Sequence, residues 1–367
     1  MAKAFSLWIR QTWEGKQLAL NPGHIHFGSV AQGSVAHRTA RLLNCSTGVA
    51  RFIISRPDLP LRCEHQLDVL VAKLPAVMFQ QRVVLVTGCT EGGLGHCICK
   101  AFARSGCKVY ATGRCQDLIN LQQYGCVELE LDVTDAAGIS RVVQQVLQEC
   151  GRIDIVVNNA GALLKAWTTE CPVEAARQLM EVNFFAQWEM NNAVAPVMVR
   201  QRSGVIVNIG SATSYCAVAQ AAAYSASKFA VRAYSDSLRV ELAPFGVKVM
   251  HVAPGCMRTR LFHKPGACNV KPTQGSPFNQ FKFATQTLYQ NEAEQGWGAL
   301  RPTDPQHIAD KVAKFALSRN PPRHYIDGWL SGLLFFLGCY MPCWVADLAQ
   351  NLRLRLPPFS SCSLARS

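Results

Sequence analysis

Charged residues are scarce in this chain. They make up 17% of its 367 residues, whereas hydrophobic residues make up 49%, and the mean hydropathy is +0.07. A chain this apolar can bury a large core, which excludes disorder throughout, and its length allows one large α/β domain with appendages. No internal repeat or low-complexity tract interrupts it. The apolar composition also favours contact with a membrane.

Acidic residues are the scarcer of the two charged classes. The chain has 37 Lys and Arg against 24 Asp and Glu, a formal net charge of +13. Such an excess favours anionic partners, namely nucleic acid, acidic lipid headgroups, or phosphorylated substrates and cofactors. Because no recognisable nucleic-acid-binding module occurs, we expect no nucleic-acid partner.

Paired cysteines of the kind that hold zinc are also missing. None of the 16 cysteines has C-x-x-C spacing, so we expect no metal site. We interpret the cysteines as small buried hydrophobic residues of a reducing compartment. The chain begins without a cleavable secretory signal, and we therefore do not expect an extracellular protein built on disulfides.

Residues 1–80 differ from the rest of the chain. They contain nine Lys and Arg but four acids, and no sustained helical or alternating pattern. We expect a basic N-terminal extension, which the composition allows to be either poorly ordered or an organelle targeting segment.

Strand and helix patterns alternate in residues 81–323, where we expect the catalytic domain. The expected strands are 83–86, 108–112, 127–131, 153–157, 204–209 and 248–252. The expected helices are 96–105, 139–150, 174–200, 224–242 and 306–317. This alternation predicts an α/β fold, a doubly wound parallel sheet of Rossmann type whose ligands bind at the carboxyl ends of the strands. The Pro- and Gly-rich stretch 263–300 reads as a long functional loop.

The stretch 329–346 contains 18 consecutive uncharged residues. As a helix it would be about 27 Å long, close to the hydrocarbon thickness of a bilayer, but Pro342 interrupts it. Three arrangements of this stretch remain open: a transmembrane span, a monotopic or hairpin insertion, and a buried core helix. We expect residues 324–367 to form a hydrophobic segment that associates with a membrane.

A glycine-rich loop follows the first expected strand and precedes a helix. Glycines let the backbone approach a pyrophosphate closely, and the helix N-terminus offers free N–H groups to its charge. The predicted cofactor contacts in this loop are Gly88, Thr90, Gly92, Gly93, Leu94 and Gly95. Arg114 stands after the second strand, where NAD-selective proteins commonly place an acid, so we expect the cofactor to be NADP(H).

Tyr224 and Lys228 are four residues apart on an expected helix, which places them on one face. A tyrosine has a pKa of about 10, which is too high for general acid–base catalysis at neutral pH. We expect the neighbouring ammonium to lower that pKa, so that the pair exchanges protons at useful pH.

Together these motifs resemble the short-chain dehydrogenase/reductase superfamily in order and spacing over residues 82–262. They are residues 87–95, Asp132, Asn158-Asn159-Ala160-Gly161, Asn183, Ser211, Tyr224-Ser225-Ala226-Ser227-Lys228 and Pro254-Gly255. The resemblance implies that Tyr224 protonates the carbonyl oxygen, assisted by Lys228, which also holds the nicotinamide ribose. It implies that Ser211 binds the substrate oxygen and that Asn183 positions a water that leads to Lys228. Asp132, Asn159, Ala160, Gly161, Pro254, Gly255 and Thr259 would contact the cofactor.

One departure concerns the glycine loop. Four residues, not the family's usual three, separate Gly88 from Gly93, so either Gly92 or Gly93 can be the pyrophosphate contact. This loop, Arg114 and the hydrophobic tail resemble the NADPH-dependent 1-acyldihydroxyacetone-phosphate reductases of the endoplasmic reticulum and lipid droplets.

We therefore expect NADPH-dependent reduction of a lipophilic ketone, 1-acyldihydroxyacetone phosphate first of all, at the endoplasmic reticulum membrane or a lipid droplet. The substrate could instead be a steroid, a retinoid or a long-chain keto-lipid, and a non-catalytic NADPH-binding lipid-droplet protein is the alternative of another class. A homo-oligomer remains open, as does a cytoplasmic or organellar location through the N-terminal extension. The basic residues that we expect near a substrate phosphate are Arg258, Arg260, Lys264, Lys271 and Lys282.

Overall fold

The chain divides into two compact units, Met1–Gln80 and Gln81–Ser367. The computed structural model describes six strands between residues 8 and 70, and then residues 81–114, 120–259, 268–270, 272–281, 302–328 and 330–356.

The first unit contains an antiparallel sheet, although its sequence has no sustained helical or alternating pattern. Its strands pair in chain order and are β1 (Trp8–Trp13), β2 (Lys16–Asn21), β3 (His24–Ala31), β4 (Ser34–Leu42), β5 (Val49–Ile54) and β6 (His65–Leu70). The first three connections are two residues long, and each contains a glycine in the sequence. Such short glycine-containing connections are typical of β-hairpins, a signal stronger here than the weak alternation within the strands.

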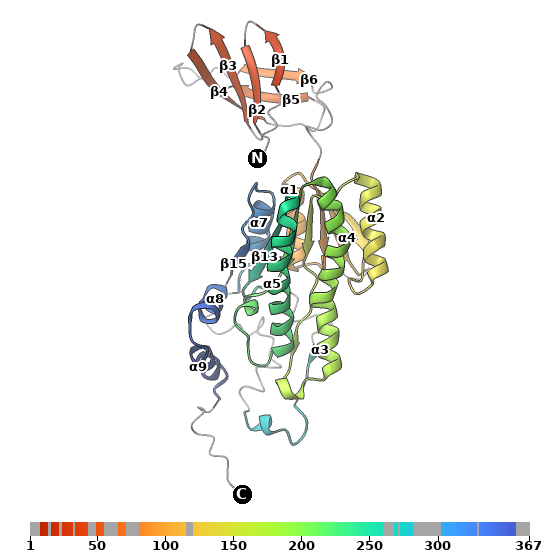
Figure 1. Cartoon of the computed structure of the whole chain (residues 1–367), viewed down its shortest axis with the longest axis vertical. Helices are drawn as coiled ribbons and strands as arrows, with labels where there is room; N and C mark the ends of the chain where they lie inside the picture. The colour runs from red at the N-terminus through yellow and green to blue at the C-terminus, as the bar shows by residue number, and fades with distance from the viewer. Residues whose placement is uncertain are drawn as a thin grey trace. The chain divides into compact units, whose positions relative to one another are not determined.

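The second unit has a parallel seven-stranded sheet with helices on both faces, which confirms the expected α/β class (Figure 1). Its strands are β7 (Val83–Thr87), β8 (Lys108–Gly113), β9 (Val127–Glu130), β10 (Ile155–Asn158), β12 (Gly204–Ile209), β13 (Val247–Pro254) and β15 (His324–Asp327). The strand order is β15-β13-β12-β10-β7-β8-β9, so the winding direction reverses between β7 and β10. Ligands of doubly wound sheets bind beside this reversal.

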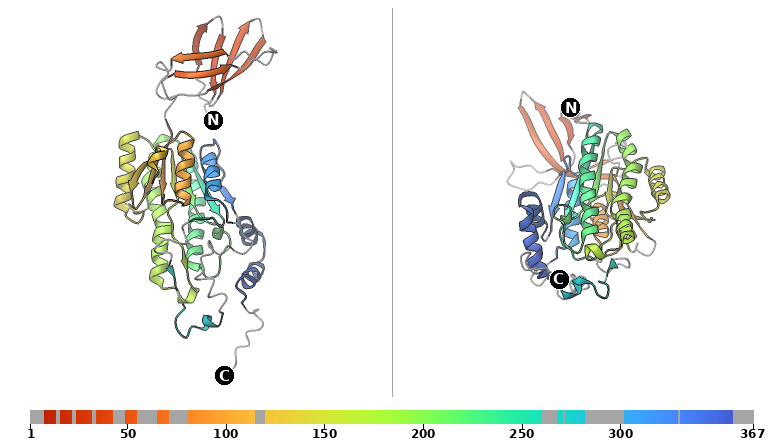
Figure 2. Two further views of the ribbon diagram at one scale, coloured as in Figure 1. Left: turned by 180° about the vertical axis from the view of Figure 1, so that it is seen from behind. Right: turned by 60° about the horizontal axis from the view of Figure 1, so that its bottom comes forward.

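Two apolar layers hold helices against the sheet, because successive strand residues point to opposite faces. On one face α1 (Leu94–Arg104) and α7 (Pro305–Ala316) pack against alternate strand residues such as Val84 and Val86. On the other face α2 (Ala136–Cys150), α4 (Ala186–Gln201) and the end of α5 (Ala222–Leu242) pack against the intervening residues. Figure 2 shows both layers.

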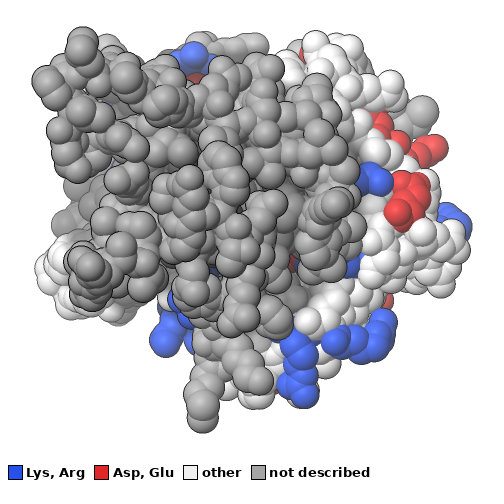
Figure 3. Space-filling model, turned by 90° about the horizontal axis from the view of Figure 1, so that it is seen from above, with Lys and Arg blue, Asp and Glu red and all other residues white. Residues whose placement is uncertain are grey.

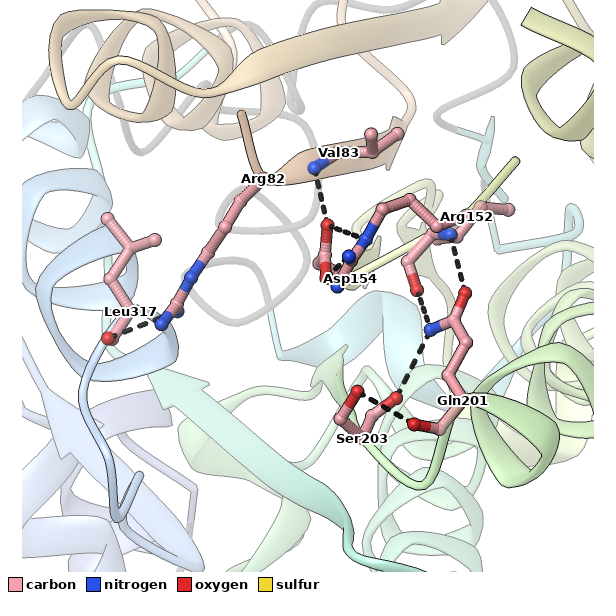
Figure 4. A network of polar contacts seen from close by, with 8 residues as sticks. Arg82, Val83, Arg152, Asp154, Gln201, Ser203 and Leu317 are labelled. Carbon is pink, nitrogen blue, oxygen red and sulfur yellow. Dashed lines mark hydrogen bonds and ion pairs between the residues drawn. The ribbon is translucent and has the colours of Figure 1, made fainter. Parts of the chain in front are cut away.

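A polar network closes the amino end of the sheet (Figure 4). The carboxylate of Asp154 accepts a hydrogen bond from the backbone N–H of Val83 at 2.8 Å and is paired with the Arg152 guanidinium. The Gln201 side chain donates to the backbone oxygen of Ile153 at 2.9 Å and accepts from its N–H at 3.1 Å. These bonds fix the start of β7 and the residues before β10 at the edge opposite the strand ends that bind ligands.

Charges are unevenly distributed over the second unit. In the view of Figure 3, most of the acidic side chains in view lie on one side of the described surface with basic side chains beside them, and further basic side chains lie along the lower edge.

The C-terminal region departs from the expected apolar segment. β15 is a seventh strand, paired in parallel with β13, although we had expected its residues to belong to the tail. Two short helices follow, α8 (Ser331–Tyr340) and α9 (Cys343–Leu354), and Pro342 is the N-cap of the second. Within the described parts of the chain, no helix is long and apolar enough to cross a membrane. Proline lacks the N–H that a continuous helix needs at this point.

Candidate active site

A cavity of about 540 Å³ opens at the carboxyl ends of the strands, beside the reversal between β7 and β10. Most of the predicted site residues line it, although they come from many separate loops and helices. They are Gly88, Thr90, Gly93, Leu94, Arg114, Asp132, Asn159, Ala160, Gly161, Ser211, Tyr224, Lys228, Pro254, Gly255 and Thr259. Gly92, Gly95 and Asn183 do not line the cavity, and each has a different structural place.

The geometry of the glycine loop distinguishes Gly92 from Gly93. Gly92 has φ of +71°, a left-handed conformation that favours glycine. Gly93 is the N-cap of α1 and lines the cavity, so its backbone is the one presented to a ligand. A Cβ on Gly95 would lie 2.6 Å from the Gly88 backbone oxygen, so Gly95 permits close packing of the helix against the strand end.

The ends of β7 and β10 are joined by side-chain hydrogen bonds. The Asn159 amide donates to the backbone oxygens of Thr87 at 2.8 Å and Gly88 at 2.9 Å. In return, the Thr87 hydroxyl accepts from the backbone N–H groups of Asn159 at 3.0 Å and Ala160 at 3.1 Å. Gly88 has φ of +70°, and a Cβ there would lie 2.6 Å from the Ala160 Cα. These contacts hold two cavity walls at a fixed separation, and we had not predicted the part that Thr87 takes in them.

Arg114 and Asp132 line the cavity where β8 and β9 end. The Asp132 carboxylate accepts hydrogen bonds from the Thr134 N–H at 2.9 Å and hydroxyl at 2.7 Å. These bonds, followed by the nearby Arg114 charge, hold the pKa of Asp132 below its usual value against the opposing effect of burial. An arginine and an ionised carboxylate therefore stand together at this end.

Tyr224, Lys228 and Ser211 meet at the centre of the cavity. The Lys228 Nζ donates to the Ile209 backbone oxygen at 3.0 Å and lies 5.7 Å from the centre of the Tyr224 ring. The Tyr224 phenol hydrogen-bonds the Ser211 side chain. Ser211 is the N-cap of a short 3-10 turn after β12, and its extended backbone directs it into the cavity lining.

We expected Lys228 to lower the pKa of Tyr224, and for the protein without a bound cofactor this prediction is wrong. Burial raises the pKa of Tyr224 above its usual value, and the hydrogen bond to Ser211 opposes this only in part. Burial also lowers the pKa of Lys228 to about 8. Removing both groups from water disfavours both charged forms, and this desolvation outweighs the effect that we expected from the spacing of the pair.

Asn183 lies behind the cavity wall, in a π-helical turn (Glu181–Phe185) between α3 (Val173–Met180) and α4. Its side chain accepts from the Ala162 N–H at 2.8 Å and donates to the Ser227 hydroxyl at 3.0 Å. A Cβ on Gly161 would lie 3.3 Å from the Asn183 Oδ1 and 3.7 Å from the Lys228 Nζ. Asn183 is thus close to Lys228, and π-helical turns often mark functional sites.

Two C-terminal helices supply cavity residues that sequence reasoning missed. Leu330 precedes α8, Leu334 lies on it, and Arg353 lies on α9, and all three line the cavity. The Gln350 amide donates to the Ala217 backbone oxygen at 3.0 Å, which fixes α9 to the loop before α5. The polar residues Gln350 and Arg353, three apart and therefore on one side of the helix, were the signal available in the sequence.

The basic residues that we expected near a substrate phosphate are placed differently. Arg258 is exposed and does not line the cavity. Arg260, Lys264, Lys271 and Lys282 lie outside the described residues. From the loop that contains them, the structure describes β14 (Cys268–Asn269), which pairs with β11 (Leu164–Lys165), and a 3-10 turn, Pro277–Gln280.

The strand order, the glycine loop at the reversal, and a serine, tyrosine and lysine around one cavity define an oxidoreductase built to bind a dinucleotide. The pattern of the family described as short chain dehydrogenase matches residues 82–267, and the chain belongs to this family.

Individual relatives agree with this assignment. The chain is 40% identical over 190 residues to a Schizosaccharomyces pombe NADPH-dependent 1-acyldihydroxyacetone phosphate reductase, which covers 51% of this chain and 64% of the yeast enzyme. It is 30% identical over 278 residues to a Bacteroides thetaiotaomicron 3-ketodihydrosphingosine reductase, covering 76% of this chain and 98% of the relative. The solved structure of a short-chain dehydrogenase from Streptomyces avermitilis matches with a TM-score of 0.61 and 30% identity, over 75% of this chain and 98% of that one.

Stability should depend on pH through Lys228. The unfolded chain titrates this lysine near 10.5, whereas burial lowers its pKa in the folded protein to about 8. Between these values the unfolded chain binds more protons, so the contribution of Lys228 to the free energy of unfolding rises with pH. In urea denaturation at pH 7.5 and 10, we expect the wild type to gain stability relative to Lys228→Met at the higher pH. The exposed Lys248→Met should show no such change, and a pH-independent difference for Lys228→Met would contradict the assignment.

Proposed function

We propose that this protein reduces a lipophilic ketone to a secondary alcohol with NADPH, and that 1-acyldihydroxyacetone phosphate is its substrate. The proposed reduction is supported by one observation: Ser211, Tyr224 and Lys228 line the same cavity as the glycine loop. The name of the yeast relative, which shares 40% identity over about half of this chain, supports the substrate.

Arg114 supports NADPH as the cofactor. It lines the cavity directly after β8, where a carboxylate would hydrogen-bond the ribose hydroxyls of NADH and repel a ribose phosphate. A guanidinium binds a phosphate through charge-assisted hydrogen bonds. The close approach of backbone at Gly88 and the exposure of the α1 N-terminus at Gly93 fit the pyrophosphate.

Bound NADPH would supply the hydride, and the chain would supply position and a proton. The Ser211 hydroxyl, already bonded to the Tyr224 phenol, would orient the ketone oxygen against it. Because burial raises the pKa of Tyr224, the phenol is protonated at neutral pH and acts as the general acid that donates to this oxygen. Lys228 would hold the nicotinamide ribose and, when charged, stabilise the phenolate that remains.

The substrate end of the cavity fits an apolar chain. It is lined by the aliphatic residues Leu163, Leu164, Leu179, Val182, Val218, Leu330 and Leu334. A long-chain keto-lipid without a phosphate is the second candidate, because the bacterial relative is named a 3-ketodihydrosphingosine reductase.

We further propose that α8 and α9 rest on a lipid surface, at the endoplasmic reticulum membrane or a lipid droplet. Their outer side exposes large apolar residues at intervals of three or four, each between 49% and 70% exposed. They are Leu333, Phe336, Tyr340, Trp344, Leu348 and Leu352. Helices of 10 and 12 residues suit an interfacial position, and the same two helices line the cavity that a lipid substrate must enter.

Turnover should depend on the Tyr224 hydroxyl. We expect Tyr224→Phe to lower kcat for NADPH-dependent reduction of 1-acyldihydroxyacetone phosphate by about 10²- to 10⁴-fold, since the general acid is lost. NADPH affinity, measured by fluorescence titration, should change little. The exposed Tyr124→Phe is the control. Full activity of the Tyr224 variant would rule out the assigned acid.

Cofactor choice should depend on Arg114. We expect Arg114→Asp to shift the ratio of kcat/KM for NADPH over NADH at least about tenfold towards NADH, the effect of losing one charge-assisted hydrogen bond. Arg319→Asp, an exposed charge reversal outside the cavity, should leave the ratio unchanged. An unchanged ratio in the Arg114 variant would contradict its proposed contact.

Membrane contact should depend on the exposed side of α9. In flotation with phosphatidylcholine vesicles containing anionic lipid, we expect the double variant Trp344→Ser, Leu348→Ser to bind at least about tenfold more weakly, because two large apolar side chains no longer enter the lipid. Val240→Ser removes an apolar side chain that is 62% exposed on α5 and should float as the wild type does. Equal flotation of all three proteins would refute the proposed surface.

A further inference from the structure

The charged residues of the cavity fall into three groups. Among the described residues, five charged side chains line it: Arg114, Asp132, Lys165, Lys228 and Arg353. Arg114 adjoins Asp132 where β8 and β9 end, and Lys228 adjoins Tyr224. The two remaining charged residues of the lining are the cations Lys165, on β11, and Arg353, on α9.

The elements that carry these two residues are hydrogen-bonded to one short segment, Ala219 and Gln220. The Arg353 guanidinium donates to the Ala219 backbone oxygen at 3.3 Å. The N–H of Ala166, next to Lys165, donates to the Gln220 backbone oxygen at 2.9 Å. Because Ala219 and Gln220 are consecutive and both line the cavity, β11 and α9 meet at one wall, and Lys165 and Arg353 both belong to the lining.

Arg353 is held firmly at this wall. The Gln350 side chain, one turn earlier on α9, accepts from the Ala219 N–H at 2.5 Å and donates to the Ala217 oxygen. On the other side, Leu354 is buried against Trp167, which stacks on Phe278 at 4.3 Å. Such packing limits the freedom of the arginine before any ligand binds, which reduces the entropy lost on binding.

The surroundings strengthen any charge interaction there. The aliphatic side chains of Leu164, Val218, Leu330 and Leu334 line the same cavity, and an anion is attracted more strongly where water is partly excluded. A guanidinium presents several N–H groups in a plane, an arrangement that matches the oxygens of a phosphate group.

We propose that Arg353, assisted by Lys165, binds the phosphate of a phosphorylated lipid ketone, and that Leu330 and Leu334 contact its acyl chain. The inference rests on the proposed reduction of a lipid ketone and names the residues that select for its headgroup. Specificity would then come from a helix outside the matched family region, residues 82–267.

The test compares two ketones in NADPH oxidation by the full chain: 1-acyldihydroxyacetone phosphate and its dephosphorylated counterpart. We expect Arg353→Gln to raise KM for the phosphorylated ketone at least about tenfold and the double variant with Lys165→Gln to raise it further, with kcat nearly unchanged. KM for the other ketone should stay within about twofold, and Arg353→Lys should restore part of the loss. The control is Arg355→Gln, because it removes an exposed charge of the same region at a residue that does not line the cavity. Equal rises in KM for both ketones, or no rise, would overturn the proposal.

A binding measurement separates this inference from the proposed reaction. Calorimetric titration of the full chain uses 1-acylglycerol 3-phosphate, the matching monoacylglycerol and inorganic phosphate. Weaker binding of the acyl phosphate alone to Arg353→Gln supports the headgroup site even if no ketone is reduced. Equal binding of the acyl phosphate to wild type and variant refutes the site even if the wild type reduces the ketone. Binding of inorganic phosphate as tight as that of the acyl phosphate would refute a lipid headgroup as the ligand.

Discussion

The hydrogen bonds between Asn159 and the end of β7 are the constraint on which the cavity depends. They join the two strands at which the winding of the sheet reverses, and they hold the first glycine of the loop in its left-handed conformation. A side chain at Gly88 would collide with Ala160 on the neighbouring strand end. The same few atoms therefore fix two walls of the cavity, where a bound dinucleotide would lie.

Burial governs the chemistry of the central residues. Lys228 is buried and Tyr224 is partly buried, and this desolvation makes the phenol a weaker acid and the ammonium a stronger one. A protonated tyrosine suits the direction of reduction, in which the carbonyl oxygen needs a proton. The arrangement is held from behind by Asn183, whose amide joins Ala162 to Ser227 across the π-helical turn.

The two C-terminal helices have two different sides. One side of α8 and α9 closes the cavity with Leu334 and Arg353, and the other exposes a row of large apolar side chains. A helix pair with these two sides would let a lipid pass from a surface into the cavity without crossing water. Its polar residues, Gln350 and Arg353, fix the pair to the loop before α5.

The sequence by itself determined the α/β class, six of the seven strands of the parallel sheet to within two residues, and the order of the site motifs, because these follow from local periodicity and from glycines with fixed conformational needs. Only the tertiary structure decided which of Gly92 and Gly93 faces the cavity, since that depends on where the turn places each backbone. It also decided the direction of the Tyr224 pKa shift, because desolvation is a property of everything packed around a side chain rather than of its spacing from Lys228. Finally, it brought β15 into the sheet and Arg353 into the site. Contacts between residues more than a hundred positions apart, such as Arg353 with Ala219, leave no periodic trace in the sequence.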